Sequence, residues 1–191
     1  MVRAGLLVAP VHGVFHAAQL ADCLELRIEC LRLVVPEDAV VTDRTAAWLH
    51  GAPMVLQPGA HLRVPAVDMF LLPGGRIRRA TARSGQRELF ISEVEEIGGL
   101  RVTTRLRTVC DLGMKLPRKP AFAAMCSMLK VSDFTVDDIR AQADGRFKGH
   151  RWVRQLRALT PLCDPRFESP GECALALIWH ETPGLPPFVP Q

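Results

Sequence analysis

The first quarter of the chain alternates short apolar runs with one amphipathic stretch. Two runs, at residues 6–9 and 11–15, predict a pair of short strands. Apolar side chains then recur every three to four residues over 19–34, which predicts an amphipathic helix. A second, shorter helix is predicted over 44–50, with residues 42–43 offering its cap.

Between residues 54 and 103 the pattern is strand-like and is interrupted by glycine and proline turns. The predicted strands are residues 61–64, 69–72, 76–82, 88–92 and 100–103. Beyond residue 103 the periodicity becomes helical. The predicted helices are residues 105–114, 121–131, 136–143, 150–159 and 169–181. The expected fold class is therefore α+β, with a small, mostly antiparallel sheet followed by a helical C-terminal half.

Composition narrows the class of protein. Apolar residues make up 48% of the 191 residues, enough to build a core, and no apolar run is long enough to span a membrane. The N-terminus has no sustained apolar segment of the signal-peptide kind, so we expect a cytoplasmic protein without a membrane partner. The six cysteines form no C-x-x-C pair and are expected to be buried free thiols. We predict no metal site and no cofactor.

Positive charge is concentrated in the second half of the chain, although the net charge is +4. Residues 76–119 hold eleven basic residues against five acidic ones, and residues 140–166 hold seven against two acids, Asp144 and Asp164. Clustered cations are the electrostatic signature of nucleic-acid binding. The candidate DNA-binding residues are Arg76, Arg78, Arg79, Arg101, Arg105, Lys148, Arg151, Arg154 and Arg157.

Each basic cluster also has a structural interpretation. Residues 76–79 form either a basic hairpin tip or an ordinary solvated turn. In the predicted helix 150–159, the basic face either follows phosphates or faces solvent opposite a core anchored by Trp152. Arg107 and Asp111, four residues apart, are expected to pair on the surface of their helix.

The sequence Ser169-Pro170-Gly171-Glu172 starts the last predicted helix with ordinary capping chemistry. This segment resembles the start of the very-short-patch-repair-endonuclease-like domain found in many actinobacterial proteins. The resemblance implies a nuclease-type α/β fold, in which the helix glutamate and acidic residues on two later strands hold a divalent cation. Glu172 alone matches that motif, because the chain ends before either strand. One carboxylate does not hold Mg²⁺, so we expect a capping role for Glu172, no catalytic residue and no enzyme activity.

Three further stretches occur together: Gly13-Val14-Phe15, residues 39–51 (Ala-Val-Val-Thr-Asp-Arg-Thr-Ala-Ala-Trp-Leu-His-Gly) and residues 99–112 (Gly-Leu-Arg-Val-Thr-Thr-Arg-Leu-Arg-Thr-Val-Cys-Asp-Leu). Their order resembles that of AbiEi-like type IV antitoxins and transcriptional regulators of actinobacteria. The resemblance runs from about residue 10 to the end of the chain. It implies a DNA-binding winged helix at the N-terminus, of which this chain retains a remnant wing.

The resemblance sets the expected organisation of the chain and its expected function. The expected domains are a winged-helix remnant with helices at 1–53, an AbiEi-like α+β domain at 54–162 and the truncated start of a nuclease-like domain at 163–191. The expected function is a non-enzymatic antitoxin-like transcriptional regulator that binds DNA, a nucleotidyltransferase-like toxin, or both. Three alternatives stay open: a truncated, inactive endonuclease-like protein, a protein-binding module that neutralises a toxin without touching DNA, and a phage-borne repressor or immunity factor.

Overall fold

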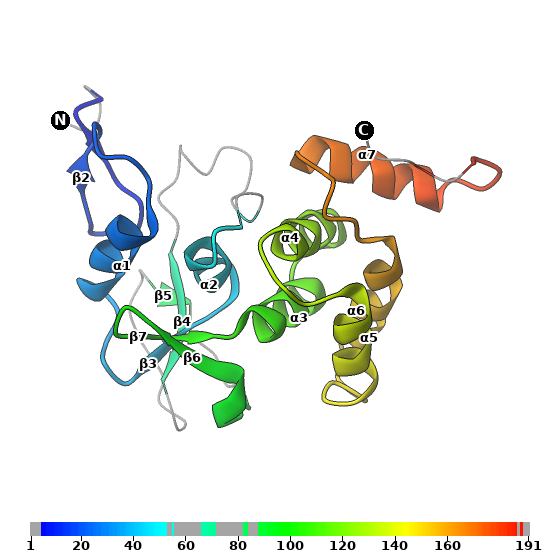
Figure 1. Ribbon diagram of the computed structural model, residues 1–191, viewed down its shortest axis with the longest axis horizontal. Coiled ribbons are helices and arrows are strands. Elements are labelled where there is room, and N and C mark those ends of the chain that lie inside the picture. Colours follow the sequence, from blue (N-terminus) through cyan, green and yellow to red (C-terminus); the bar gives the residue numbers. More distant parts are fainter. Residues whose placement is uncertain are drawn as a thin grey trace. The chain divides into compact units, whose positions relative to one another are not determined.

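Strand β3 (Ala39–Val41) lies at the centre of a five-stranded sheet in the computed structural model, which describes residues 5–52, 55, 66–71, 82–83, 88–186 and 188 (Figure 1). The strand order is β5-β4-β3-β7-β6. β3 pairs antiparallel with β4 and parallel with β7, while β4 and β5 are parallel and β6 and β7 are antiparallel. The sheet is therefore mixed rather than mostly antiparallel. The other strands are β4 (Val67–Leu71), β5 (Ala82–Arg83), β6 (Val94–Ile97) and β7 (Leu100–Thr103).

The chain divides into two compact units. Met1–Leu49 and Pro58–Thr104 form the first, here called the sheet unit, and His50–Gln57 and Arg105–Gln191 form the second, the helical unit. The expected domain boundaries at 53/54 and 162/163 stay predictions. None of the helices in the described part of the chain is long and apolar enough to cross a membrane.

Two helices supply the apolar side chains that cover the sheet. Helices α1 (Leu24–Arg32) and α2 (Asp43–Leu49) place apolar side chains in the same buried cluster as residues of β3, β4 and β7. Members of that cluster are Cys30, Leu31, Ala39, Val41, Ala46, Leu49, Val67, Met69, Leu100 and Val102. The side-chain hydroxyl of Thr45 accepts a 2.9 Å hydrogen bond from the backbone N–H of Asp68, which fastens α2 to β4.

The β6–β7 turn is built from Gly98 and Gly99, whose φ angles of +54° and +78° suit glycine. A Cβ atom on Gly98 would lie 2.7 Å from Cδ1 of Ile28 on α1, so a side chain is also excluded by packing. Arg32 of α1 donates to the carbonyl oxygen of Gly98 over 2.6 Å. The hairpin turn is therefore held against α1 from 66 residues away in sequence.

Several predictions for the sheet unit are confirmed, and others are wrong. An N-terminal antiparallel pair of strands exists, as β1 (Leu7–Val8) and β2 (His16–Ala17), and β1 lies within the predicted range 6–9. The strand predicted at 11–15 is wrong, because those residues form the turn before β2, and the identity of the pair as a wing stays a prediction. The predicted strand at 88–92 is wrong. Its end belongs to a 3₁₀ turn, η3 (Ile91–Glu93), and the strand follows as β6. The strand predicted at 61–64 and most of the one at 76–82 lie outside the described residues.

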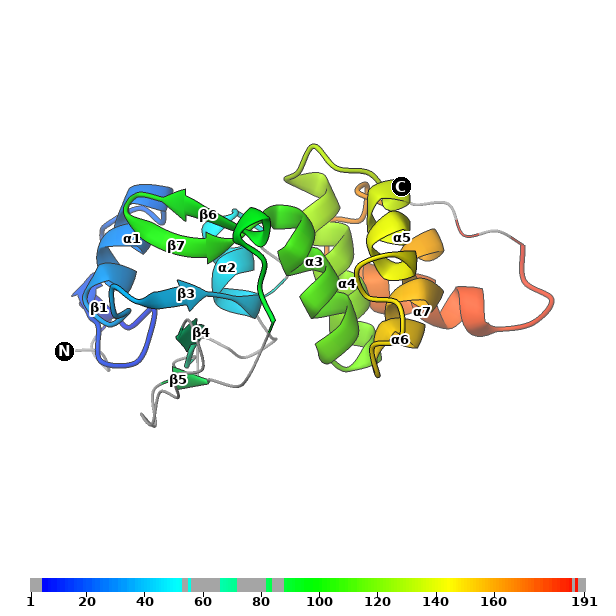
Figure 2. The same cartoon turned by 90° about the horizontal axis from the view of Figure 1, so that it is seen from below.

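The helical unit is built around α4 (Arg118–Lys130), in which every residue from Ala121 to Leu129 is buried. Helices α3 and α7 pack against α4, and α5 and α6 pack against each other (Figures 1 and 2). Fully buried side chains of the unit include Leu112, Phe122, Met125, Met128, Ile139, Phe147, Leu156, Leu159, Phe167 and Leu177. The remaining elements are α3 (Arg105–Lys115), α5 (Val136–Asp144), α6 (Val153–Leu159), η4 (Thr160–Leu162) and α7 (Pro170–Glu181).

Capping residues explain which helices were predicted well. The hydroxyl oxygen of Thr135 accepts a hydrogen bond from the backbone N–H of Asp138, and the Asp138 carboxylate accepts one from the backbone N–H of Thr135. Helix α5 begins at the residue after Thr135. Helices α3, α5 and α7 lie within one residue of their predicted bounds. Helix α6 begins three residues later than predicted, because the chain before it is still turning.

Candidate nucleic-acid interface

The segment between α5 and α6, residues 145–152, is a closely wound turn that carries several cations. Successive backbone hydrogen bonds shape it: the N–H of Phe147 donates to the Gln142 carbonyl over 2.9 Å, and that of His150 to the Phe147 carbonyl over 3.0 Å. Gly149 has a φ of +84°, a conformation that other residues adopt at a cost. The aromatic ring of Phe147 is buried and anchors the turn in the core.

Most of the seven basic residues in 140–166 already have a partner. Arg140 pairs with Asp137 at 2.5 Å, Arg157 with Asp144 at 2.8 Å, and Arg166 with Asp164 at 2.6 Å. The guanidinium of Arg146 lies over the Phe147 ring, 5.5 Å from its centroid.

The three that remain are Lys148, Arg151 and Arg154. Their side chains are exposed and form no ion pair with any residue that the structure describes. Together with Trp152 they are called the basic tip from here on.

Trp152 corrects one of the two interpretations of this segment. The sequence allowed a core anchored by Trp152, but the residue is 53% exposed. The guanidinium of Arg151 lies over its indole, 4.6 Å from the ring centroid. Phe147, Val153 and Leu156 fill the core instead. His150 and Arg151 precede α6, so the predicted helical face of residues 150, 154 and 157 is wrong, and Arg154 and Arg157 alone lie on the helix.

Arg157 also lies on α6, but it is not part of the basic tip, because its side chain already has partners within the chain. Besides its ion pair with Asp144, it donates a 2.8 Å hydrogen bond to the carbonyl oxygen of Ala143. Both partners lie in the last turn of α5. Arg157 therefore ties α6 to α5.

The other predicted DNA-binding residues lie elsewhere. Arg76, Arg78 and Arg79 are outside the described residues. Arg101 lies on β7, is half-buried and donates to the backbone carbonyl of Glu37. Arg105 is the first residue of α3 and is exposed. Among the predicted DNA-binding residues that the structure describes, Lys148, Arg151 and Arg154 therefore share one short segment, the basic tip.

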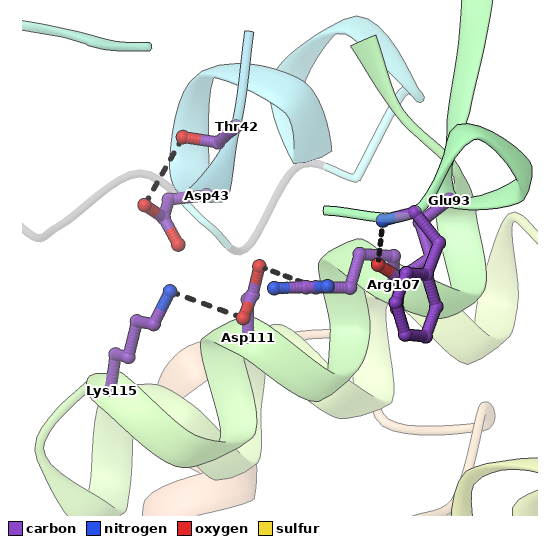
Figure 3. Close-up of polar contacts among 7 residues, drawn as sticks. Thr42, Asp43, Glu93, Arg107, Asp111 and Lys115 are labelled. Carbon is purple, nitrogen blue, oxygen red and sulfur yellow. Dashed lines mark hydrogen bonds and ion pairs between the residues drawn. The ribbon is translucent and has the colours of Figure 1, made fainter. Parts of the chain in front are cut away.

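Arg107 and Asp111 pair as predicted, but the pair is buried and not on the helix surface. The Nε of Arg107 lies 3.0 Å from Oδ2 of Asp111, and the two side chains are 4% and 0% exposed. The ammonium group of Lys115, one turn further along α3, lies 3.1 Å from Oδ1 of Asp111 (Figure 3). The Phe147 ring lies 5.2 Å from the Arg107 guanidinium. This network stabilises α3 from within and is not a phosphate-binding surface.

Glu172 has the contacts of a capping residue. Its backbone N–H donates to Oγ of Ser169 over 3.1 Å, and its carboxylate accepts from the backbone N–H of Glu168 over 2.9 Å. Both bonds close the start of α7. This geometry agrees with the capping role expected from the sequence.

Three of the cysteines meet inside the helical unit. The thiol of Cys126 hydrogen-bonds with those of Cys163 and Cys173, and five of the six cysteines are buried. The hydrogen bond with Cys163 and burial raise the pKa of the Cys126 thiol above the ordinary thiol range, although the hydrogen bond with Cys173 acts in the opposite direction. The hydrogen bond with Cys126 and burial raise the pKa of the Cys173 thiol. All six thiols are free, as predicted, but Cys23 is exposed, so the prediction of a buried thiol is wrong for that residue. The described residues contain no group of three or more His, Cys, Asp or Glu side chains arranged to hold a metal ion.

Comparison with known proteins gives one match. Residues 39–162 match the family model for the AbiEi antitoxin C-terminal domain. The matched region starts at the first residue of β3 and ends at the last residue of η4, and it includes the basic tip. Searches of curated proteins and of solved structures found no match.

Proposed function

Because the chain belongs to the AbiEi antitoxin C-terminal domain family, we propose that it is a non-enzymatic antitoxin-like regulator that binds nucleic acid through the basic tip. The observation that carries the proposal is the separation of the cations in 140–166 into two groups. Arg140, Arg157 and Arg166 are paired with carboxylates, and the Arg146 guanidinium lies over the buried Phe147 ring. Lys148, Arg151 and Arg154 form no ion pair with any described residue, and the ring beneath Arg151 is the exposed Trp152 of the tip itself. Cations on one turn that no described carboxylate neutralises suit phosphate, because no ion pair has to be broken when the phosphate binds.

The proposal is tested by fluorescence anisotropy with purified protein, its own upstream duplex and a scrambled duplex, at salt concentrations from about 50 to 200 mM. Replacing Lys148, Arg151 and Arg154 together by alanine is expected to weaken binding to both duplexes. The slope of log K against log salt should fall by about 2 to 3, since each lost phosphate contact removes about 0.9. Tighter binding to its own duplex is expected of a regulator.

The matched control removes two cations that are already paired. Arg140→Ala with Arg166→Ala changes the net charge by two, but leaves the basic tip intact. The double variant should keep nearly the wild-type salt slope. If the triple and double variants lower affinity equally, net charge and not the basic tip is responsible. Wild-type protein that binds neither duplex contradicts the nucleic-acid part of the proposal.

A protein partner is favoured by a separate feature, in the sheet unit. Ile91 is 91% exposed and Phe90 is 47% exposed, side by side at the start of η3. The carboxylate of Glu93 accepts a 2.8 Å hydrogen bond from the N–H of Phe90, which holds the backbone at the start of η3. Adjacent exposed apolar side chains on a fixed turn are typical of contact sites for other proteins.

We take a nucleotidyltransferase-like toxin as that partner, because the family is one of antitoxins. In cells that co-express such a toxin from the same genome, the wild-type chain should restore growth. Ile91→Glu should restore it less, at equal protein level, whereas the control variant Arg140→Ala with Arg166→Ala should restore growth as the wild type does. Equal rescue by wild type and Ile91→Glu would exclude this surface.

A further inference from the structure

Trp152 is the one residue of the basic tip whose side chain is not a cation. Its exposure of 53% is measured with the Arg151 guanidinium already over one face of the ring. The buried residues of this segment are Phe147, Val153 and Leu156, and an exposed indole lowers solubility. The ring is therefore available for a contact outside the chain.

The backbone that carries Trp152 is hydrogen-bonded within the helical unit. The carbonyl oxygen of Trp152 accepts from the N–H of Gln155 over 3.2 Å, and the N–H of Val153 donates to the His150 carbonyl over 3.2 Å. The side-chain amide of Gln155 in turn donates to the carbonyl oxygens of Gly113 and Leu116, over 2.8 and 2.9 Å. The backbone at Trp152 is thus tied to α3 through Gln155, so the segment that carries the indole belongs to the folded helical unit.

The surroundings of the ring specify the chemistry of that ligand. Lys148 precedes it and Arg154 follows it, and the acid nearest in sequence, Asp144, is held by Arg157. A flat aromatic surface between cations is the arrangement that proteins use for unpaired bases, because every base has a π face and a phosphate on either side. A duplex keeps its base faces stacked on each other, so it offers the indole nothing beyond its ends.

We infer that the basic tip binds single-stranded nucleic acid more tightly than duplex, with an unpaired base stacked on the Trp152 indole and the flanking phosphates on Lys148 and Arg154. The inference rests on the proposed function, since it names the ligand class of the same surface. Arg151 keeps its place on the other face of the ring, and its guanidinium completes the stack.

The test uses the full chain and three labelled probes of about twelve nucleotides: oligothymidylate, oligouridylate and a mixed-sequence duplex. Anisotropy is measured at equal phosphate concentration. Both single strands, or one of them, should bind more tightly than the duplex, and the difference between the two shows whether DNA or RNA is preferred. Trp152→Ala should weaken single-strand binding by ~5- to 150-fold and duplex binding by less than about twofold. Trp152→Phe, which keeps a π face, should recover most of the loss.

The slope of log K against log salt distinguishes the contribution of base stacking from that of phosphate contacts. Trp152→Ala should leave the slope unchanged, whereas Arg154→Ala should lower it by about 0.7 for a single strand. Thermal unfolding of each variant checks that the turn is intact, and Trp152→Phe keeps the test valid if the alanine variant is unstable.

Three results would overturn the inference. Wild-type protein that binds the duplex at least as tightly as both single strands overturns the inference and leaves the proposed function standing. Tight single-strand binding that is the same in Trp152→Ala also overturns it. Wild-type protein that binds none of the three probes also overturns the inference, and the proposed function is then decided by the upstream duplex.

Discussion

The Nε of Arg107 lies 3.0 Å from Oδ2 of Asp111, one turn along α3, and both side chains are buried. Removing one partner of such a pair leaves the other charge in a poorly solvated place. Asp111→Ala removes the carboxylate that pairs with both Arg107 and Lys115, so we expect it to lower the free energy of unfolding by about 3–5 kcal/mol. Urea denaturation followed by far-ultraviolet circular dichroism measures the change.

The exposed pair of Arg140 and Asp137 on α5 is the control for Asp111. These side chains are 53% and 83% exposed, and Asp137→Ala should cost less than about 1 kcal/mol. Equal losses in the two variants would show that burial of the α3 pair has no energetic consequence.

Arg154 and Arg157, three residues apart on α6, are expected to behave differently. Arg157→Ala removes hydrogen bonds to Asp144 and to the Ala143 carbonyl, so it should lower the free energy of unfolding by about 1 kcal/mol. Arg154→Ala should change stability by less than about 0.5 kcal/mol but lower the salt slope of duplex binding by about 1. The reverse assignment, with Arg157 setting the slope and Arg154 the stability, would contradict the structure.

Ser169 caps α7 through its Oγ, which accepts from the N–H of Glu172 over 3.1 Å. Ser169→Ala should destabilise the chain by ~1 kcal/mol, whereas Ser169→Asp, which also caps, should stay close to wild type. Thermal unfolding of the two variants compares them. A similar loss in both would mean that the hydroxyl, and not capping in general, matters here.

Asp164 gives the stability of the helical unit a dependence on pH. The Arg166 guanidinium, which hydrogen-bonds to both carboxylate oxygens, holds the pKa of Asp164 below its ordinary 3.8. Because the folded pKa is the lower one, its stabilisation is present above pH 4 or so and is lost as pH falls through the folded pKa. Asp164→Asn should therefore be less stable than wild type at neutral pH, and the two urea midpoints should converge in acid. Midpoints that separate further as pH falls would give the opposite sign.

The thiols differ in reactivity because they differ in exposure and pKa. At neutral pH, iodoacetamide should modify Cys23 alone in the folded protein and all six cysteines in denaturant, as counted by mass spectrometry. Cys126 and Cys173 are buried, and a hydrogen bond from a neighbouring thiol (Cys163 for Cys126, Cys126 for Cys173) together with burial keeps the pKa of each high, so they should react last during unfolding. Early modification of either one would show that α7 opens from α4 without global unfolding.

Local chemistry in the sequence was sufficient to place several elements. Thr135 and Ser169 marked the starts of α5 and α7, since a cap acts through the next three residues. Strand β6 was missed because Glu95 and Glu96 interrupt its apolar pattern. Its pairing with β7 determines that it is a strand, and pairing is not visible in a window of a few residues.

The candidate site shows the same division between local and tertiary information. The four-residue spacing predicted that Arg107 meets Asp111, but the burial of the pair depends on Phe147, which comes from a turn far along the chain. Charge clustering pointed to Lys148, Arg151 and Arg154. The exposure of Trp152 was not predictable, because tertiary packing decides which apolar residues of this segment are buried, and here they are Phe147, Val153 and Leu156.

The place of β3 in its sheet has a consequence during synthesis. Its antiparallel partner β4 follows within about thirty residues, but its parallel partner β7 begins at Leu100. At 5–20 residues per second, the ribosome takes roughly 3 to 12 s to go from Val41 to Leu100. Throughout that time one edge of the most buried strand has no neighbour to pair with, and an unpaired apolar edge is a template for other chains. The nascent chain is therefore most vulnerable to aggregation before β7 emerges, and a chaperone that covers β3 would act in that interval.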